Sequence, residues 1–304
     1  MMYYRRKIIL NLLDRFGGSL TAKRFQKLLF LMTRNQEKKA FDFVPYKYGC
    51  YSFQASQDLH TMAGQGFLQI IDKPDGSEIL FKRMPDEAVD LTLMDSAIID
   101  MLLAKFGSLS QDELIKHTYN KYPFYAIRSV IAKDLLSSAE LAKVHAQERH
   151  FDEPALFTIG YEGLSLEKYI NKLLINDVRV LCDVRKNAYS QKYGFTKGTL
   201  KLACEGVGLK YVHVPQLGIE SEDRQELMTQ ADYNRLFERY EATTLRDNWE
   251  YILMVRDIIR ENSRVALTCF EADPRQCHRS RVAKALMTIE DRDYELTHLL
   301  NGIN

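Results

Sequence analysis

A long apolar segment is missing from this chain of 304 residues, in which no run approaches the roughly 18 apolar residues of a membrane-spanning helix. The N-terminus also lacks the apolar core, of about 7–15 residues, that a secretory signal peptide carries. The five cysteines are odd in number, widely scattered and free of any C-x2-C pair, which suits a reducing compartment better than a disulfide scaffold. We therefore expect a cytoplasmic protein that binds no membrane.

The composition is that of a globular protein, because 46% of the residues are hydrophobic and 27% are charged. The length allows two domains of ordinary size. The formal net charge of +1 conceals an asymmetry, since the first fifty residues hold 11 basic and only 3 acidic side chains. Such a concentration favours contact with a phosphate backbone, although a solvated helix face explains it as well.

The first domain, residues 1–150, is expected to be helical and winged-helix-like. Apolar residues recur at helical spacing over 5–16 and from Thr21 to about Arg34, and Ser52 is placed to cap a third helix. Two β-type runs, at 67–71 and 78–82, flank the turn signal Lys73-Pro74-Asp75-Gly76. Because a winged helix commonly binds nucleic acid, we expect contact with DNA in preference to RNA. The residues expected to make it are Lys23, Arg24, Lys27 and Lys47.

The second domain, residues 151–304, is expected to be of the α/β class. Strand-like runs at 156–159, 178–184, 209–214 and 264–269 alternate with helical patterns. This alternation predicts a Rossmann-like, mostly parallel sheet with helices on both faces. Ligands of such sheets bind beyond the carboxyl ends of the strands.

Reactive side chains follow all four predicted strands. A sheet needs apolar strands but no ionisable group at every strand end, so this pattern predicts one functional pocket. After the fourth strand, Cys277-His278-Arg279 also begins a predicted helix, and a helix N-terminus favours negative charge. The residues expected at this edge are Tyr161, Asp183, Arg185, Ser190, Tyr211, His213, Cys269, Glu271, Cys277, His278 and Arg279.

Four motifs in the second domain resemble the hallmarks of the domain-of-unknown-function family 488. The resemblance covers about 155–290 and implies a Rossmann-like domain whose marked residues gather at one site, without implying a reaction. The motifs are Thr158-Ile159-Gly160-Tyr161, Asp183-Val184-Arg185, Tyr211-Val212-His213-Val214-Pro215-Gln216-Leu217-Gly218, and Cys269-Phe270-Glu271 with Cys277-His278-Arg279. Gln191 and Ile219 depart from the usual pattern, which weakens a phosphate-binding role for that loop.

The first domain is similar to the helical domain of the Panacea and SocA antitoxin group. This resemblance implies a toxin–antitoxin or phage-defence setting. The residues that carry it are Lys27-Leu28-Leu29-Phe30, Phe43-Val44-Pro45-Tyr46-Lys47-Tyr48-Gly49 and Leu114-Ile115-Lys116-His117-Thr118.

Acid–base chemistry on a nucleobase, a nucleotide or a nucleic-acid backbone is the interpretation that we favour, in DNA repair or phage defence. Glu271 or Asp183 acts as the base in this hypothesis, with Cys269 and His213 in the same catalytic group. Arg185 and Arg279 hold phosphate, and Tyr161 or Tyr211 stacks on a base. The remaining residues expected to bind substrate are Ser190, Cys277 and His278.

Three alternatives remain open from the residues alone. The first is a cysteine-dependent phosphatase or rhodanese-like sulfurtransferase, because Cys269 and Arg275 have the C-x5-R spacing of cysteine phosphatases and Asp183-Val184-Arg185 is similar to a rhodanese strand. Against it, the loop between Cys269 and Arg275 is acidic and poor in glycine, which disfavours phosphate binding. Metal binding is disfavoured, because adjacent Cys277 and His278 would point about 100° apart on a helix. A structural cluster would make the protein a non-catalytic nucleic-acid-binding regulator. We expect no metal or other cofactor, and self-association is left open.

Overall fold

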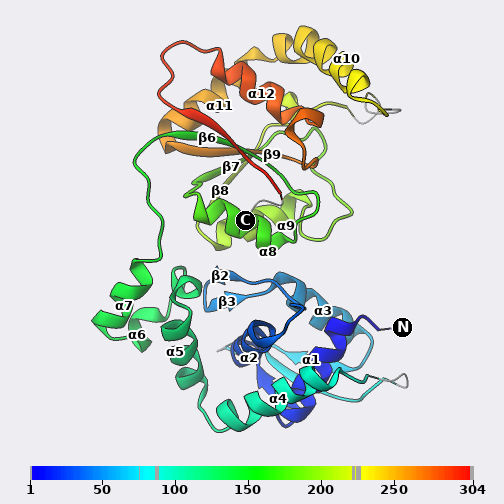
Figure 1. The fold of residues 1–304 in the computed structure, drawn as a ribbon, viewed down its shortest axis with the longest axis vertical. Helices are drawn as coiled ribbons and strands as arrows, with labels where there is room; N and C mark the ends of the chain where they lie inside the picture. The colour runs from blue at the N-terminus through cyan, green and yellow to red at the C-terminus, as the bar shows by residue number, and fades with distance from the viewer. Residues whose placement is uncertain (1, 75, 86–88, 221–222, 224–226, 302–304) are drawn as a thin grey trace. The chain divides into compact units, whose positions relative to one another are not determined.

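The computed structural model describes residues 2–74, 76–85, 89–220, 223 and 227–301, so Asp75 of the predicted turn lies outside the described residues. The chain forms two compact units, Met1–Glu148 and Arg149–Asn304 (Figure 1). None of the described helices combines the length and the apolar character needed to cross a lipid bilayer.

The first unit begins with the elements of a winged helix. Helices α1 (Tyr4–Arg15), α2 (Ala22–Asn35) and α3 (Phe53–Gly64) alternate with strand β1 (Ser19–Thr21) and precede the hairpin of β4 (Leu68–Ile71) and β5 (Glu78–Phe81). Strand β5 pairs antiparallel with both β1 and β4, which gives the sheet order β1-β5-β4. The predicted winged-helix-like class is therefore confirmed.

An additional hairpin separates α2 from α3. It consists of β2 (Val44–Tyr46) and β3 (Gly49–Tyr51), in which Pro45 and Gly49 favour extended or turning backbone. The unit then continues through helices α4 (Leu93–Phe106), α5 (Gln111–Lys121), α6 (Ala132–Leu135) and α7 (Ser138–His145).

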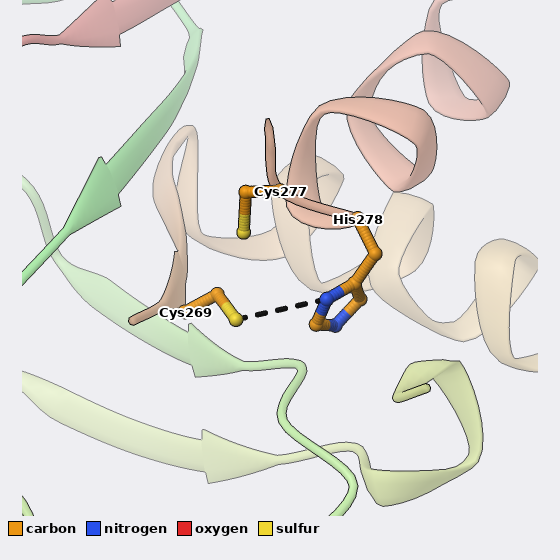
Figure 2. Close-up of side chains that lie close together, drawn as sticks. All are labelled: Cys269, Cys277 and His278. Atoms are coloured by element: carbon orange, nitrogen blue, oxygen red, sulfur yellow. Dashed lines mark hydrogen bonds between the residues drawn. The ribbon is translucent and has the colours of Figure 1, made fainter. Parts of the chain in front are cut away.

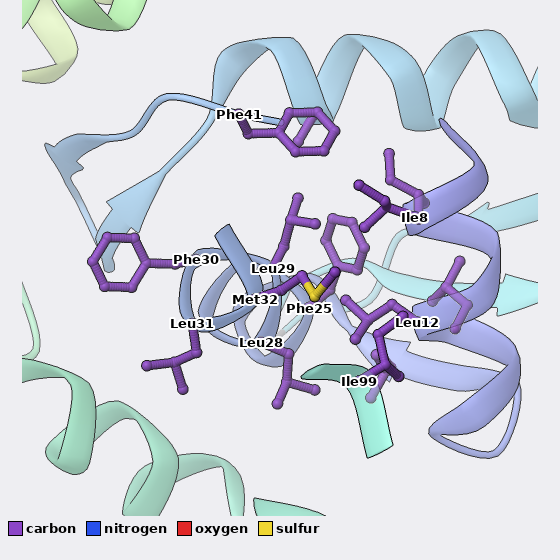
Figure 3. Close-up of a cluster of buried hydrophobic side chains, with 14 of the residues drawn as sticks. Ile8, Leu12, Phe25, Leu28, Leu29, Phe30, Leu31, Met32, Phe41 and Ile99 are labelled. Carbon is purple, nitrogen blue, oxygen red and sulfur yellow. The ribbon is translucent and has the colours of Figure 1, made fainter. Parts of the chain in front are cut away.

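Helix α2 is the central helix of this unit. Thr21 caps its N-terminus by accepting a hydrogen bond from the backbone N–H of Arg24. Residues 25–33 of α2 are all buried, so the helix is covered on every face rather than on one apolar stripe. Figure 3 shows how its side chains pack with Ile8 and Leu12 of α1 and Ile99 of α4.

The second unit is a five-stranded parallel sheet of the predicted Rossmann-like class. Its order is β10-β6-β9-β7-β8, with β6 at Ala155–Gly160, β7 at Val180–Asp183, β8 at Lys210–His213 and β9 at Arg264–Cys269. Strand β10 (Glu295–Leu299) forms one edge. It was not predicted, because its residues are exposed or half-buried and form no apolar run.

Five helices cover this sheet on both faces. Helices α8 (Leu166–Ile175) and α9 (Lys197–Gly206) lie on one face, and α10 (Gln230–Tyr240), α11 (Trp249–Asn262) and α12 (Arg279–Met287) lie on the other (Figure 1). The central strand β9 is buried along its whole length. Its carboxyl end therefore lies at the middle of the sheet edge, where the strand order reverses.

Candidate functional site in the α/β unit

The register of the parallel sheet brings the reactive strand ends into one row. Cys269 at the end of β9 pairs with Gly160 of β6, and the preceding Thr268 pairs with Asp183 of β7. Asp183 in turn pairs with His213 of β8. The motifs that are far apart in the sequence thus meet at the carboxyl edge of the sheet.

Asp183 and Arg185 form a buried ion pair at this edge. The Asp183 carboxylate accepts from Arg185 Nε at 2.8 Å, from Arg185 Nη2 at 2.5 Å and from the Tyr211 hydroxyl at 2.6 Å. Arg185 also donates to the Tyr161 hydroxyl and to the Phe195 carbonyl, each at 2.9 Å. Asp183 is 0% exposed and Arg185 is 5% exposed. Both charges are therefore committed to each other, and neither fits the predicted role of base or phosphate ligand.

Electrostatics favour this pairing strongly. Burial by itself would lower the pKa of the Arg185 guanidinium, but the hydrogen bonds and the negative charge of Asp183 outweigh burial and raise that pKa. Burial, followed by the charge of Asp183, raises the pKa of the Tyr211 hydroxyl, which keeps it protonated as a donor. The pair and its tyrosine act as a rigid support for the strand ends.

The two predicted stacking residues are likewise used inside the protein. The Tyr161 ring is 3% exposed and stacks on Phe195 at 4.2 Å between ring centroids. Tyr211 is held by its hydrogen bond to Asp183. An exposed aromatic ring lies close by at Tyr189, which is 70% exposed.

The loop after β9 presents carbonyl groups, not a nest of amides, to the inside of the site. Arg279, which is 1% exposed, donates from Nη1 to the Glu271 carbonyl at 2.5 Å and from Nη2 to the Ala272 carbonyl at 3.1 Å. Arg275 turns outward to pair with Asp273 and is 80% exposed at its side chain. Arg279 thus shapes the loop instead of holding phosphate, and the C-x5-R spacing does not build a phosphate cradle.

Gly160 allows this loop to approach the sheet closely. A Cβ at position 160 would lie 1.8 Å from the Glu271 carbonyl oxygen, far inside van der Waals contact. The same crowding occurs at Gly218, where a Cβ would lie 2.0 Å from the backbone nitrogen of Lys186. These two glycines set the positions of Glu271 and Lys186 by backbone contact.

Cys269, Cys277 and His278 converge beside the loop, as Figure 2 shows. The Cys269 Sγ lies 3.6 Å from His278 Nδ1 and 3.3 Å from Glu271 Oε2. His278 Nε2 donates to the Val184 carbonyl at 2.8 Å, which leaves Nδ1 as the acceptor that faces the thiol. The two sulfur atoms and Nδ1 all lie within 4.8 Å of one another.

Local backbone geometry explains why neighbouring residues can share this point. Cys277 is extended, with φ −133° and ψ 133°, and His278 is the cap residue that precedes α12. The 100° separation assumed for two residues on one helix therefore does not apply, and that argument against a shared ion was wrong. Burial, followed by a hydrogen bond to Cys269 and the negative charges of Cys269 and Glu271, raises the pKa of the Cys277 thiol.

A cavity of about 230 Å³ opens on this cluster. Its lining includes Cys269, His278, Phe270 and Tyr161, together with Arg185, Lys186, Asn187, Tyr189 and Ile219. A neighbouring hollow of about 400 Å³ shares Lys186, Asn187 and Tyr189 and adds His213. The His213 Nε2 donates to the Arg185 carbonyl at 2.9 Å, so this ring is anchored at the wall of the second hollow.

Lys186, Asn187 and Tyr189 line both hollows but were missed in the sequence. They follow the Asp183-Val184-Arg185 motif closely, and this position after a strand end could have predicted that they line the site. Ser190, which was predicted, accepts a hydrogen bond from the backbone of Lys192 and belongs to the lining of neither hollow. The other ten predicted residues of this unit lie at or next to the carboxyl edge of the sheet.

Residues 165–286 match the family described as "Domain of unknown function DUF488". The resemblance inferred from the motifs is therefore confirmed for that part of the chain. No curated protein matches the chain. The range contains Asp183, Arg185 and the cluster of Cys269, Cys277 and His278, whereas the first unit lies outside it, and the similarity of that unit to Panacea and SocA antitoxins stays a prediction.

Two of the four predicted nucleic-acid contacts of the first unit are engaged internally. Lys27 is 1% exposed and donates from Nζ to the Tyr48 carbonyl at 2.5 Å. Burial lowers the pKa of this amine. Arg24 donates to the carbonyls of Leu109, Phe106 and Gly107 at the end of α4. Neither side chain fits the predicted phosphate contact, because Lys27 is buried with the core residues of α2 and Arg24 is held by backbone carbonyls.

Lys23 and Lys47 remain suitable for contact with a partner. Lys23 lies with Nζ 4.5 Å from the centroid of the Tyr48 ring, and Lys47 is exposed on the β2–β3 hairpin. Elsewhere, Arg5 and Arg6 both pair with the carboxylate of Asp58, which is 0% exposed. Much of the basic excess in the first fifty residues is therefore structural.

Proposed function

We propose that the α/β unit is the catalytic part of an enzyme that processes a nucleotide, free or within nucleic acid, and that its chemistry is hydrolytic. The winged-helix unit supplies contact with nucleic acid, DNA in preference to RNA. A setting in repair or phage defence agrees with both halves. The observation that carries the proposal is a cavity lined by Cys269, His278 and Lys186, with the Glu271 carboxylate lying directly next to the Cys269 sulfur.

The size and lining of the cavity favour part of a nucleotide as the bound group. About 230 Å³ is less than the roughly 300–1,000 Å³ typical of sites for drug-sized ligands, so a base, a sugar or a phosphate fits better than a larger molecule. Lys186 offers a cation at the wall and pairs there with Glu220, also exposed, at 2.7 Å. An anionic substrate group can compete with an ion pair so open to solvent.

Glu271 is the residue best placed to move a proton. Its carboxylate is half-buried next to the Cys269 sulfur, and its backbone is fixed by Arg279 and by contact with Gly160. Asp183, the other predicted base, is sealed within its ion pair. We therefore assign general acid–base catalysis to Glu271 and substrate contact to Lys186 and Tyr189.

The test is turnover by purified protein of a panel of nucleotides, DNA and RNA. Glu271→Gln keeps the shape of the side chain and should lower turnover by about 100-fold or more. Tyr189→Ala should raise KM more than it lowers kcat, because the ring contacts substrate in both ground and transition states. Gln276→Ala, at an exposed position on the same loop, is the control and should leave both constants unchanged. Unchanged turnover in Glu271→Gln would refute the assignment.

A non-catalytic nucleic-acid-binding regulator is the second candidate, and the winged-helix strand order favours it. Binding of DNA and RNA measured across salt separates the two. For Lys23→Ala and Lys47→Ala, the slope of log K against log salt should fall by about 0.9 for each DNA phosphate that the variant no longer neutralises. Binding without turnover by any panel member would favour the regulator.

Thiol catalysis is the remaining alternative, as a phosphatase or a sulfurtransferase. The Cys269 thiol faces His278, which could accept its proton. A phosphate site, however, needs converging backbone amides and an inward arginine, whereas here the loop carbonyls face Arg279 and Arg275 points outward. Turnover of aryl phosphate or thiosulfate that is abolished in Cys269→Ser and kept in Glu271→Gln would establish it.

A further inference from the structure

We propose that Cys269, Cys277 and His278 bind one divalent zinc-type ion through two thiolates and one imidazole nitrogen. The inference concerns the same site as the proposed hydrolytic function and deepens it, but metal binding itself needs no substrate.

The spacing of the three donor atoms fits tetrahedral coordination. With Zn–S bonds of about 2.3 Å and Zn–N bonds of about 2.0–2.1 Å, a sulfur and a nitrogen on one ion lie about 3.6 Å apart and two sulfurs about 3.8 Å apart. The observed distance from Cys269 Sγ to His278 Nδ1 is 3.6 Å, and all three donor atoms lie within 4.8 Å of one another (Figure 2). Only small side-chain rotations are needed to close the set.

The surroundings of His278 prepare the correct nitrogen. Nε2 donates to the Val184 carbonyl, so the neutral ring keeps its lone pair on Nδ1. A ligating histidine usually has such a partner on its other nitrogen, which fixes both tautomer and ring orientation. His278 is 1% exposed, so the ring has little freedom to turn away.

The chemistry of the donors selects the class of ion. Two soft thiolates and one imidazole suit Zn²⁺ and exclude the hard ions Mg²⁺ and Ca²⁺, which prefer oxygen ligands. The cluster also lies on rigid elements, because Cys269 ends the buried strand β9 and Cys277 and His278 lead into α12. The site is therefore preformed by the sheet and one helix.

The fourth coordination position faces the cavity. Cys269 and His278 both line it, so water or a substrate atom can approach the ion from that side. The Glu271 Oε2 lies 3.3 Å from the Cys269 sulfur, within reach of a water on the ion. Three protein ligands with one open position are typical of catalytic zinc sites, whereas structural sites are closed by a fourth ligand.

The experiment measures metal binding directly on the full chain. Protein purified without chelator, then loaded with Zn²⁺ or Co²⁺ and dialysed, should retain about one ion per chain, with cobalt absorption of a tetrahedral thiolate site. Cys277→Ser and His278→Ala should each weaken binding by more than about 100-fold, because loss of a mere outer-shell partner already costs about 10–100-fold. Cys204→Ser, a buried cysteine of α9 outside the cluster, is the matched control and should bind like wild type.

A second measurement uses wild type alone and avoids variants that fail to fold. Zn²⁺ should protect Cys269 from alkylation, with the modified residue identified by peptide mapping, while magnesium should not. Retention of much less than one ion, equal binding by Cys277→Ser, or a Cys269–Cys277 disulfide in the freshly purified protein would overturn the inference.

Glu271→Gln separates this inference from the proposed function. It should keep the ion and lose turnover. Binding without any turnover would leave the metal site standing and remove the hydrolytic function, whereas turnover by protein that retains no ion after loading would do the reverse.

Discussion

Removal of the Asp183 carboxylate should strongly destabilise the α/β unit. In Asp183→Asn, the Arg185 guanidinium stays buried at 5% exposure and loses its counter-charge. Breaking a buried pair from one side costs about 3–5 kcal/mol, because it leaves an uncompensated charge. That loss is a large share of the roughly 5–15 kcal/mol by which a domain is stable.

The chain contains its own control and its own reporter. Asp273 and Arg275 repeat the Asp-x-Arg spacing in solvent, with side-chain exposures of 32% and 80%, so Asp273→Asn should cost no more than about 1 kcal/mol. Trp249 is the single tryptophan and lies in α11, so its fluorescence during urea unfolding follows this unit alone.

The double variant Asp183→Asn/Arg185→Met tests the reason for the effect. If the cost arises from the stranded charge, removing Arg185 as well should recover about 1–3 kcal/mol relative to the sum of the single variants. A loss below about 1 kcal/mol in Asp183→Asn, or strict additivity, would refute the buried-pair argument.

Three further outcomes are expected. Gly160→Ala should destabilise the unit by about 1–3 kcal/mol in urea, because the new Cβ meets the Glu271 carbonyl, whereas Gly198→Ala, whose Cβ meets nothing within 4 Å, should not. Burial raises the pKa of the Cys204 thiol in the folded protein. The free energy of unfolding should therefore be unaffected by this thiol below about pH 8.5, the thiol pKa of the unfolded chain, and should fall by up to about 1.4 kcal/mol per pH unit above it. Cys204→Ala should flatten this alkaline decline, and an unchanged slope would contradict it. Lys27→Ala should lower the melting temperature of the first unit, because it removes a fully buried side chain and the donor to the Tyr48 carbonyl, whereas Lys47→Ala, at an exposed position, should melt like wild type.

The α/β class and the approximate strand ends could be predicted because they depend on local patterns. Neighbouring residues are enough to recognise apolar strand-like runs that alternate with helical patterns. In a parallel sheet the strand ends then lie at one edge, so the reactive groups that follow them are expected to meet there. Strands β1 and β10 could not be predicted in this way, since each is short or exposed and exists only through pairing with β5 or β6.

The role of Lys27 illustrates the same limit in the first unit. Periodicity predicted one apolar face of α2, with the basic residues outside. Packing of α1, α4 and the β2–β3 hairpin around α2 buries Lys27 in the core of the unit. The residues next to it in the sequence do not predict that burial.

By itself, the sequence determined which chemical groups reach the carboxyl edge of the sheet, because strand direction and residue order set that edge. The tertiary structure decided which of them are paired inside the protein and which gather into one cluster beside the cavity. Asp183, Arg185 and Arg279 are consumed by partners in the protein, while Cys269, Glu271, Cys277 and His278 are gathered at one point. Burial and partners depend on segments that are distant in the sequence, and only folding brings those together.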